Sequence, residues 1–109
     1  MYTLEYTKSF NVDIESIRDY FRAKREKRIG ANLINSITKK LSDLELMPFS
    51  RALVRDELLA SFGYRTLNIK NYILLFTIDD ENKVVFVERI FHGSQDWSNI
   101  LKDDLEDEN

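Results

Sequence analysis

The segment Tyr72-Ile73-Leu74-Leu75-Phe76-Thr77-Ile78 decides the fold, because it is apolar at nearly every position. A continuous apolar run of this length is typical of a strand that is buried on both faces. A strand-like run over residues 64–69 precedes it, and another over residues 83–91 follows the polar turn at residues 79–82. Since only short links join the three runs, we expect them to be neighbouring strands of an antiparallel sheet.

Two amphipathic helices are predicted upstream of these strands. The first carries an apolar stripe with spacings of four, three and four residues, formed by Phe10, Ile14, Ile17 and Phe21. We expect Ser9 to cap its amino end, because a serine hydroxyl accepts a hydrogen bond from a free N–H group of the first turn. The second helix is predicted over residues 30–47 and ends at Pro48, which has no N–H group to donate. The two helices are expected to form an antiparallel hairpin.

The two ends of the chain complete the predicted order of elements. Residues 2–7 alternate between apolar and polar side chains, which predicts a half-buried strand. Residues 49–62 give mixed signals and are expected to form a loop or a short irregular element. A last helix follows Ser94, its expected N-cap, with one apolar face formed by Trp97, Ile100, Leu101 and Leu105. On this face we expect Trp97 to anchor the helix to the rest of the fold.

The predicted order is therefore β-α-α-β-β-β-α, an α+β fold. The helical hairpin is expected to pack on one face of a small, mainly antiparallel sheet. We expect a single domain over residues 1–102. Residues 103–109 are strongly acidic and are predicted to form a frayed, solvated tail.

Composition excludes several classes of site. The 109 residues include no cysteine, so disulfides, thiolate metal sites and cysteine nucleophiles are excluded. The only histidine is His92, which excludes metal sites built on histidine pairs. The longest apolar run is too short to cross a membrane, and the first residues do not resemble a signal peptide. We expect a cytoplasmic protein that needs neither a metal nor a cofactor.

One segment of the sequence is strongly basic, although the formal net charge of the chain is -3. Its cations could bind phosphates or a protein partner, and the alternative is a solvated helix end and turn. The candidate RNA-binding or partner-binding residues of this segment are Arg22, Lys24, Arg25, Lys27 and Arg28.

Three residues of the predicted strands are candidates for catalysis: Arg65, Arg89 and His92. If their strands are neighbours, these side chains could approach one another. RNA cleavage without a metal needs a group that moves protons and cations that stabilise charge on the phosphoryl oxygens. A histidine suits the first task and arginines the second. The alternatives are a structural histidine at a strand end and arginines paired with carboxylates.

Several segments together resemble the RelE/ParE superfamily of bacterial toxins. They are residues 2–7, residues 64–67, residues 71–76 and the ending over residues 88–97. The last segment is similar to the pattern Arg-x-x-[His/Tyr]-Gly-x-x-Asp that is common in the superfamily. The resemblance covers about residues 2–101 and implies the order of elements given above.

The resemblance also implies a function and partners. It implies the toxin of a type II toxin–antitoxin module, neutralised by a cognate antitoxin that could contact the exposed parts of Phe10, Tyr20 and Phe21. RelE-like members cleave messenger RNA on the ribosome, whereas ParE-like members inhibit DNA gyrase without nuclease activity. We expect a ribosome-dependent mRNA endonuclease, with a gyrase inhibitor and a decayed, non-toxic member as alternatives. One departure is Ile73, which corresponds to a position where the nucleases often carry an arginine.

Overall fold

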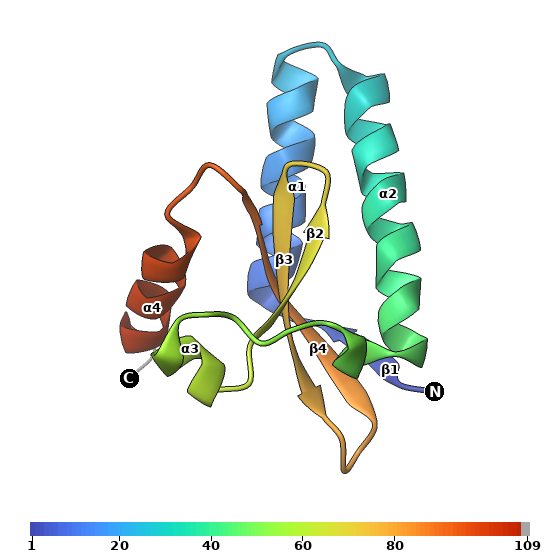
Figure 1. The fold of residues 1–109 in the computed structure, drawn as a ribbon. Coiled ribbons are helices and arrows are strands. Elements are labelled where there is room, and N and C mark those ends of the chain that lie inside the picture. The colour runs from blue at the N-terminus through green and yellow to red at the C-terminus, as the bar shows by residue number, and fades with distance from the viewer. Residues whose placement is uncertain (108–109) are drawn as a thin grey trace.

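A four-stranded sheet with the order β1-β4-β3-β2 forms the centre of the computed structural model, which describes residues 1–107 (Figure 1). Its strands are β1 (Thr3–Tyr6), β2 (Arg65–Ile69), β3 (Tyr72–Asp79) and β4 (Val84–His92). The last three pair antiparallel, and β1 pairs parallel with β4. The apolar run that decides the fold is β3, and Leu74, Leu75 and Phe76 in it are fully buried. The predicted mainly antiparallel sheet is confirmed.

The helices α1 (Lys8–Ala23) and α2 (Lys27–Leu46) form the predicted hairpin on one face of the sheet. Their buried stripes share one core cluster with alternate residues of the strands, since neighbours along a strand point to opposite faces. The helices approach closely near the bend, where a Cβ atom on Gly30 would lie 2.9 Å from Phe21 Cβ. The cluster comprises Phe10, Ile17, Leu33, Ile37, Leu41, Leu44, Leu67, Ile69, Leu74, Phe76, Val85, Val87 and Ile90.

The residue that caps α1 is Thr7, so the prediction of Ser9 was wrong. The Thr7 hydroxyl accepts a hydrogen bond from the Phe10 N–H at 3.0 Å and donates one to the Glu88 carbonyl at 2.7 Å. Because β1 already ends at Tyr6, the chain turns directly into the helix, and Ser9 lies inside the first turn.

The other face of the sheet is covered by elements from the later part of the chain. The segment predicted as irregular contains a 3-10 turn, η1 (Pro48–Ser50), and a short helix, α3 (Glu57–Ser61). The helices α3 and α4 (Trp97–Asp107) pack around a second core, and α4 lies across the strands from α2 (Figure 1). Trp97 packs against this core, as expected for an anchor. The buried members of the core are Val54, Leu59, Tyr64, Leu75, Phe91 and Leu101.

The acidic tail was predicted wrongly for residues 103–107, which belong to α4. The helix continues because Leu101 is buried and Leu105, one turn later, packs on the same core. Ser94 is not its cap, since the helix begins only at Trp97. The remainder of the predicted tail, residues 108–109, lies outside the described residues. None of the described helices combines the length and apolar character that crossing a bilayer requires.

Candidate functional site

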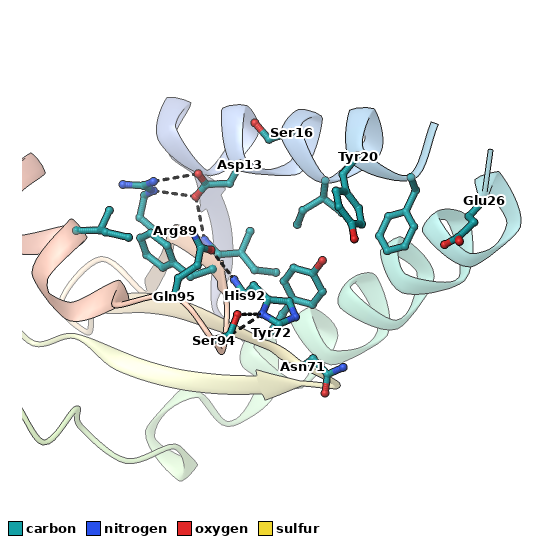
Figure 2. Close-up of a pocket in the computed structure, with 15 residues that line it drawn as sticks. Asp13, Ser16, Tyr20, Glu26, Asn71, Tyr72, Arg89, His92, Ser94 and Gln95 are labelled. Carbon is teal, nitrogen blue, oxygen red and sulfur yellow. Dashed lines mark hydrogen bonds and ion pairs between the residues drawn. The ribbon is translucent and has the colours of Figure 1, made fainter. Parts of the chain in front are cut away.

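Arg89 is held between two carboxylates from different helices. Its Nε and Nη2 atoms lie 2.8 and 3.0 Å from the two carboxylate oxygens of Asp13 on α1, and its Nη1 contacts Asp104 on α4. The side chains of Arg89 and Asp13 are only 16% and 14% exposed. Donating hydrogen bonds to Asp13, and then to Asp104, raises the pKa of Arg89 above its ordinary value despite burial. The guanidinium therefore carries a positive charge, which is already paired with the carboxylates of Asp13 (Figure 2) and Asp104.

A β-bulge in β4 determines the side of the sheet to which the Arg89 side chain points. The register pairs Leu75 with Arg89 and Phe76 with Val87, so Glu88 has no residue opposite it on β3. The extra residue shifts the alternation by one position. Val87 and Ile90, three residues apart, therefore both join the core under the hairpin, while Arg89 lies beside α1 and α4.

Side chains close the outer edge of β4 where β1 ends. The pairing with β1 stops at Val87, and beyond it two backbone N–H groups of β4 donate to side chains. The Ile90 N–H donates to Asp13 Oδ2 at 3.0 Å, and the His92 N–H donates to Gln95 Oε1 at 2.9 Å. The Asp13 carboxylate thus accepts hydrogen bonds from a backbone amide and from the guanidinium.

His92 lies at the exposed end of β4. Its Nδ1 atom accepts a hydrogen bond from the Ser94 N–H at 3.1 Å and lies 2.6 Å from the Ser94 hydroxyl oxygen. Since Nδ1 is an acceptor, the neutral ring carries its proton on Nε2. The ring meets Tyr72 edge to face, with centroids 5.2 Å apart.

A groove of about 670 Å³ connects these residues. Arg89 and His92 both line it, so the structure brings two of the three predicted catalytic residues to one site. Asp13, Tyr20 and Tyr72 line the same groove (Figure 2).

The structure does not bring Arg65 to this groove, so the expected convergence of all three residues is wrong. Arg65 lies on β2, which β3 separates from β4. Its Nη1 atom donates to the Arg51 carbonyl at 2.5 Å, and its guanidinium lies 5.2 Å from the centre of the Phe49 ring. The strand order and these local contacts place it in a different part of the molecule.

The basic segment lies at the bend of the helical hairpin, as the sequence predicted. Arg22 pairs with Asp19 at 2.8 Å, and Lys24 Nζ lies 4.8 Å from the centre of the Tyr20 ring. Arg25 turns the chain with a φ of 58°. Lys27 and Arg28 begin α2, and all five predicted basic residues are exposed.

Sequence reasoning missed Asp13, although a signal was present. Asp13 is three residues after Phe10 and four before Ile17, so it falls on the apolar stripe of α1. A carboxylate on a stripe that packs against the core requires a buried partner. The described residues include no cluster of three or more histidine, cysteine, aspartate or glutamate side chains suited to a metal ion.

Solved structures share this architecture and define the class of protein. A chain from the chromosomal ParDE toxin–antitoxin system of P. aeruginosa superimposes with a TM-score of 0.68 at 19% identity, covering 84% of this chain and 96% of the other. A chain of the RelBE2 toxin–antitoxin complex from Mycobacterium tuberculosis gives 0.59 at 26% identity, with coverages of 84% and 96%. YafQ from E. coli strain BL21(DE3) gives 0.52 at 20% identity, with coverages of 84% and 93%. The fold is that of the RelE/ParE toxin superfamily.

The family follows from the sequence comparison. A model described as the ParE toxin of the type II toxin–antitoxin system parDE matches residues 4–97. Because this match spans most of the sequence, the chain belongs to the ParE toxin family. No curated protein matches the chain significantly.

Proposed function

We propose that this toxin acts by binding a protein target rather than by cleaving RNA, in the manner of ParE-like inhibitors of DNA gyrase. The observation that carries this proposal is the pairing of Arg89 with Asp13 and Asp104. The family match to ParE toxins supports it as well. A cognate antitoxin is the partner that neutralises such a toxin, and the similarity to chains of the ParDE system and the RelBE2 complex supports this part of the proposal.

The groove is poorly suited to hold a phosphate. An arginine that stabilises the transition state of RNA cleavage must direct its donors at the phosphoryl oxygens. The Nε and Nη2 donors of Arg89 are directed at Asp13 instead. A phosphate would have to displace this carboxylate, and the groove carries a second carboxylate, Glu26, at its other end (Figure 2). Each carboxylate repels an anion.

A ribosome-dependent mRNA endonuclease is the second candidate, and one observation favours it. His92 and Arg89 line the same groove, so a proton-transfer group and a cation are close together. In that case Arg89 would leave Asp13 when RNA binds, and the basic segment from Arg22 to Arg28 would contact ribosomal RNA. In this candidate His92 is the proton-transfer group, because it is the only histidine of the sequence and lines the groove beside Arg89.

Induction of the chain without its antitoxin in a bacterial host tests the proposal. Pulse labelling would follow DNA and protein synthesis separately over the first minutes. We expect DNA synthesis to stop first. We also expect His92→Gln to remain toxic, because a binding toxin needs no proton transfer. Glu81→Gln, in the exposed β3–β4 turn, is the matched control for expression and folding.

Two outcomes would overturn the proposal. An early arrest of translation with mRNA cut in ribosome-bound regions, abolished by His92→Gln, would establish the endonuclease. Strong expression without any growth defect would indicate a family member that has lost toxicity. In both cases immunoblotting must show full-length chain at equal levels, so that degradation is not mistaken for inactivity.

A further inference from the structure

Aromatic side chains form the walls of the groove between α1 and the end of the sheet. Tyr20 and Phe21 come from α1, with ring centroids 5.1 Å apart, whereas Tyr72 and His92 come from β3 and β4. In Figure 2 the rings of Tyr20 and Tyr72 lie on opposite sides of the opening, beneath α1 and above the sheet. Burial, and then the negative charge of Tyr20 if it ionised, raise the pKa of Tyr72. Tyr72 is therefore a neutral phenol at physiological pH.

The formal charges that line the groove sum to a negative value. Asp13 and Glu26 contribute two carboxylates, and in the described part of the chain Arg89 is the one arginine or lysine that lines the groove. That cation is already bound by Asp13 and, from outside the groove, by Asp104. Glu26 is exposed and takes part in none of the ion pairs formed within residues 1–107. Aromatic faces beside a carboxylate favour a cation.

A side chain of the protein itself illustrates this preference. Lys24 Nζ lies 4.8 Å from the centre of the Tyr20 ring. The hydrogen bond and charge of Tyr20 raise the pKa of Lys24, and Glu26 adds a smaller effect in the same direction. A cation is therefore stabilised at the mouth of the groove by two of the residues that line it.

The backbone beside the groove is not available for strand addition. The N–H groups of Ile90 and His92 are occupied by Asp13 and Gln95. The Gln95 N–H donates to the His92 carbonyl at 3.0 Å, which occupies that acceptor too. A partner strand would find these positions already bonded, so side-chain contacts are the mode of binding left open at this stretch of β4.

We propose that this groove binds an arginine side chain presented by a protein partner. The planar guanidinium can stack against the Tyr20 and Tyr72 rings, and the negative charge of Glu26, which lines the same groove, attracts it. A lysine ammonium would gain less, because it has no flat face to stack. The inference goes beyond the proposed function, since it concerns one side chain of a partner and holds whichever target the toxin has.

Titration of the purified chain with a small arginine probe tests the inference. The probe is Nα-acetyl-arginine methylamide, and its uncharged isostere Nα-acetyl-citrulline methylamide is the control. Backbone ¹H–¹⁵N spectra report the site through Tyr20, Tyr72 and His92. We expect saturable shifts at these amides for the arginine probe, with affinity that weakens as salt is added, and none for the citrulline probe. Gyrase is absent, so failure here is separate from failure of the proposed function.

Three variants assign the binding to the proposed groups. Glu26→Gln removes the carboxylate and Tyr20→Leu removes an aromatic face, and each is expected to weaken binding by about two- to fivefold. Lys24→Gln removes the competing internal cation and is expected to leave binding as tight or tighter. Glu81→Gln removes an exposed carboxylate from a distant turn and should change nothing.

Specific results would overturn the inference. Equal shifts with the citrulline probe would show that charge is not recognised. Saturation of the same amides by inorganic phosphate, without an effect of the arginine probe, would show an anion site. Wild-type affinity in Glu26→Gln, with the variant spectrum otherwise intact, would exclude the carboxylate from the site.

Discussion

The ion pairs of Arg89 with Asp13 and Asp104, called here the Arg89 clamp, lead to a quantitative prediction for the free energy of unfolding. Asp13→Ala removes the acceptor of two guanidinium hydrogen bonds and of the Ile90 N–H bond. Both side chains of the pair are mostly buried. Removing one partner of a buried ion pair costs about 3–5 kcal/mol, because the other charge loses its compensation. Among the residues that the structure describes, only the half-exposed Asp104 would still pair with Arg89 in this variant. The range includes the loss of the hydrogen bond from the Ile90 N–H.

Asp104→Ala is the comparison within the same clamp. The Asp104 side chain is 49% exposed, so solvent screens its attraction to Arg89. Exposed ion pairs contribute about 0.2–1 kcal/mol. The double variant Asp13→Asn with Arg89→Met buries no charge and keeps an acceptor for the Ile90 N–H. Its expected cost is about 1–2 kcal/mol, well below that of Asp13→Ala.

Urea unfolding at pH 7, followed by far-UV circular dichroism and Trp97 fluorescence, measures these differences. With a slope of about 2 kcal/mol per molar urea, Asp13→Ala should lower the midpoint by about 2 M, whereas Asp104→Ala should lower it by less than about 0.5 M. If both single variants cost less than about 1 kcal/mol, or if Asp104→Ala costs more than Asp13→Ala, the buried clamp does not contribute as described.

Three further predictions concern other parts of the fold. In urea titrations, Thr7→Ala should lower the free energy of unfolding by about 1–2 kcal/mol and Ser9→Ala by less than about 0.5 kcal/mol. The reason is that Thr7, and not Ser9, caps α1. Equal costs of the two substitutions would contradict this. Gly30→Ala should destabilise by about 1–2 kcal/mol despite better helix propensity, since the added methyl group would meet Phe21 Cβ; a gain in the melting temperature would show that the helices can separate. The carboxylate of Asp56, the N-cap of α3, accepts hydrogen bonds from Lys102 on α4 and from the Leu59 N–H. These hydrogen bonds hold the pKa of Asp56 below 3.8. The stabilisation that the Asp56 carboxylate gives the folded state is therefore complete above pH 3.8 and is lost as pH falls through the folded-state pKa. Asp56→Asn should lower the melting temperature at pH 7 and flatten its decline at acid pH. An unchanged acid profile would refute this.

The fold could be predicted from the sequence where the signal is local. The apolar run of β3 and the stripes of α1 and α2 are periodic within a single element, and each element is present. The cap of α1 was misplaced because Thr7 also bonds to Glu88, a contact between distant parts of the chain. The predicted apolar face from Trp97 to Leu105 already reached beyond residue 102, but residues 103–107 were assigned to a frayed tail because their charge was weighed above that spacing.

The site was harder to predict because it depends on strand order and on a bulge. Sequence alone placed Arg65, Arg89 and His92 on strand-like runs, and only the order β4-β3-β2 separates the first from the others. The bulge at Glu88 decides the direction of Arg89 and leaves no trace in periodicity. The exception is Asp13, whose position on an apolar stripe could have revealed the clamp.

A supercoiling assay distinguishes inhibition of DNA gyrase from cleavage of mRNA. Purified chain would be added to DNA gyrase, relaxed plasmid and ATP, and in parallel to a reconstituted translation reaction in which mRNA integrity is followed. We expect the chain to block supercoiling at concentrations that leave mRNA intact and translation running. Normal supercoiling together with cleavage of ribosome-bound mRNA would contradict this expectation.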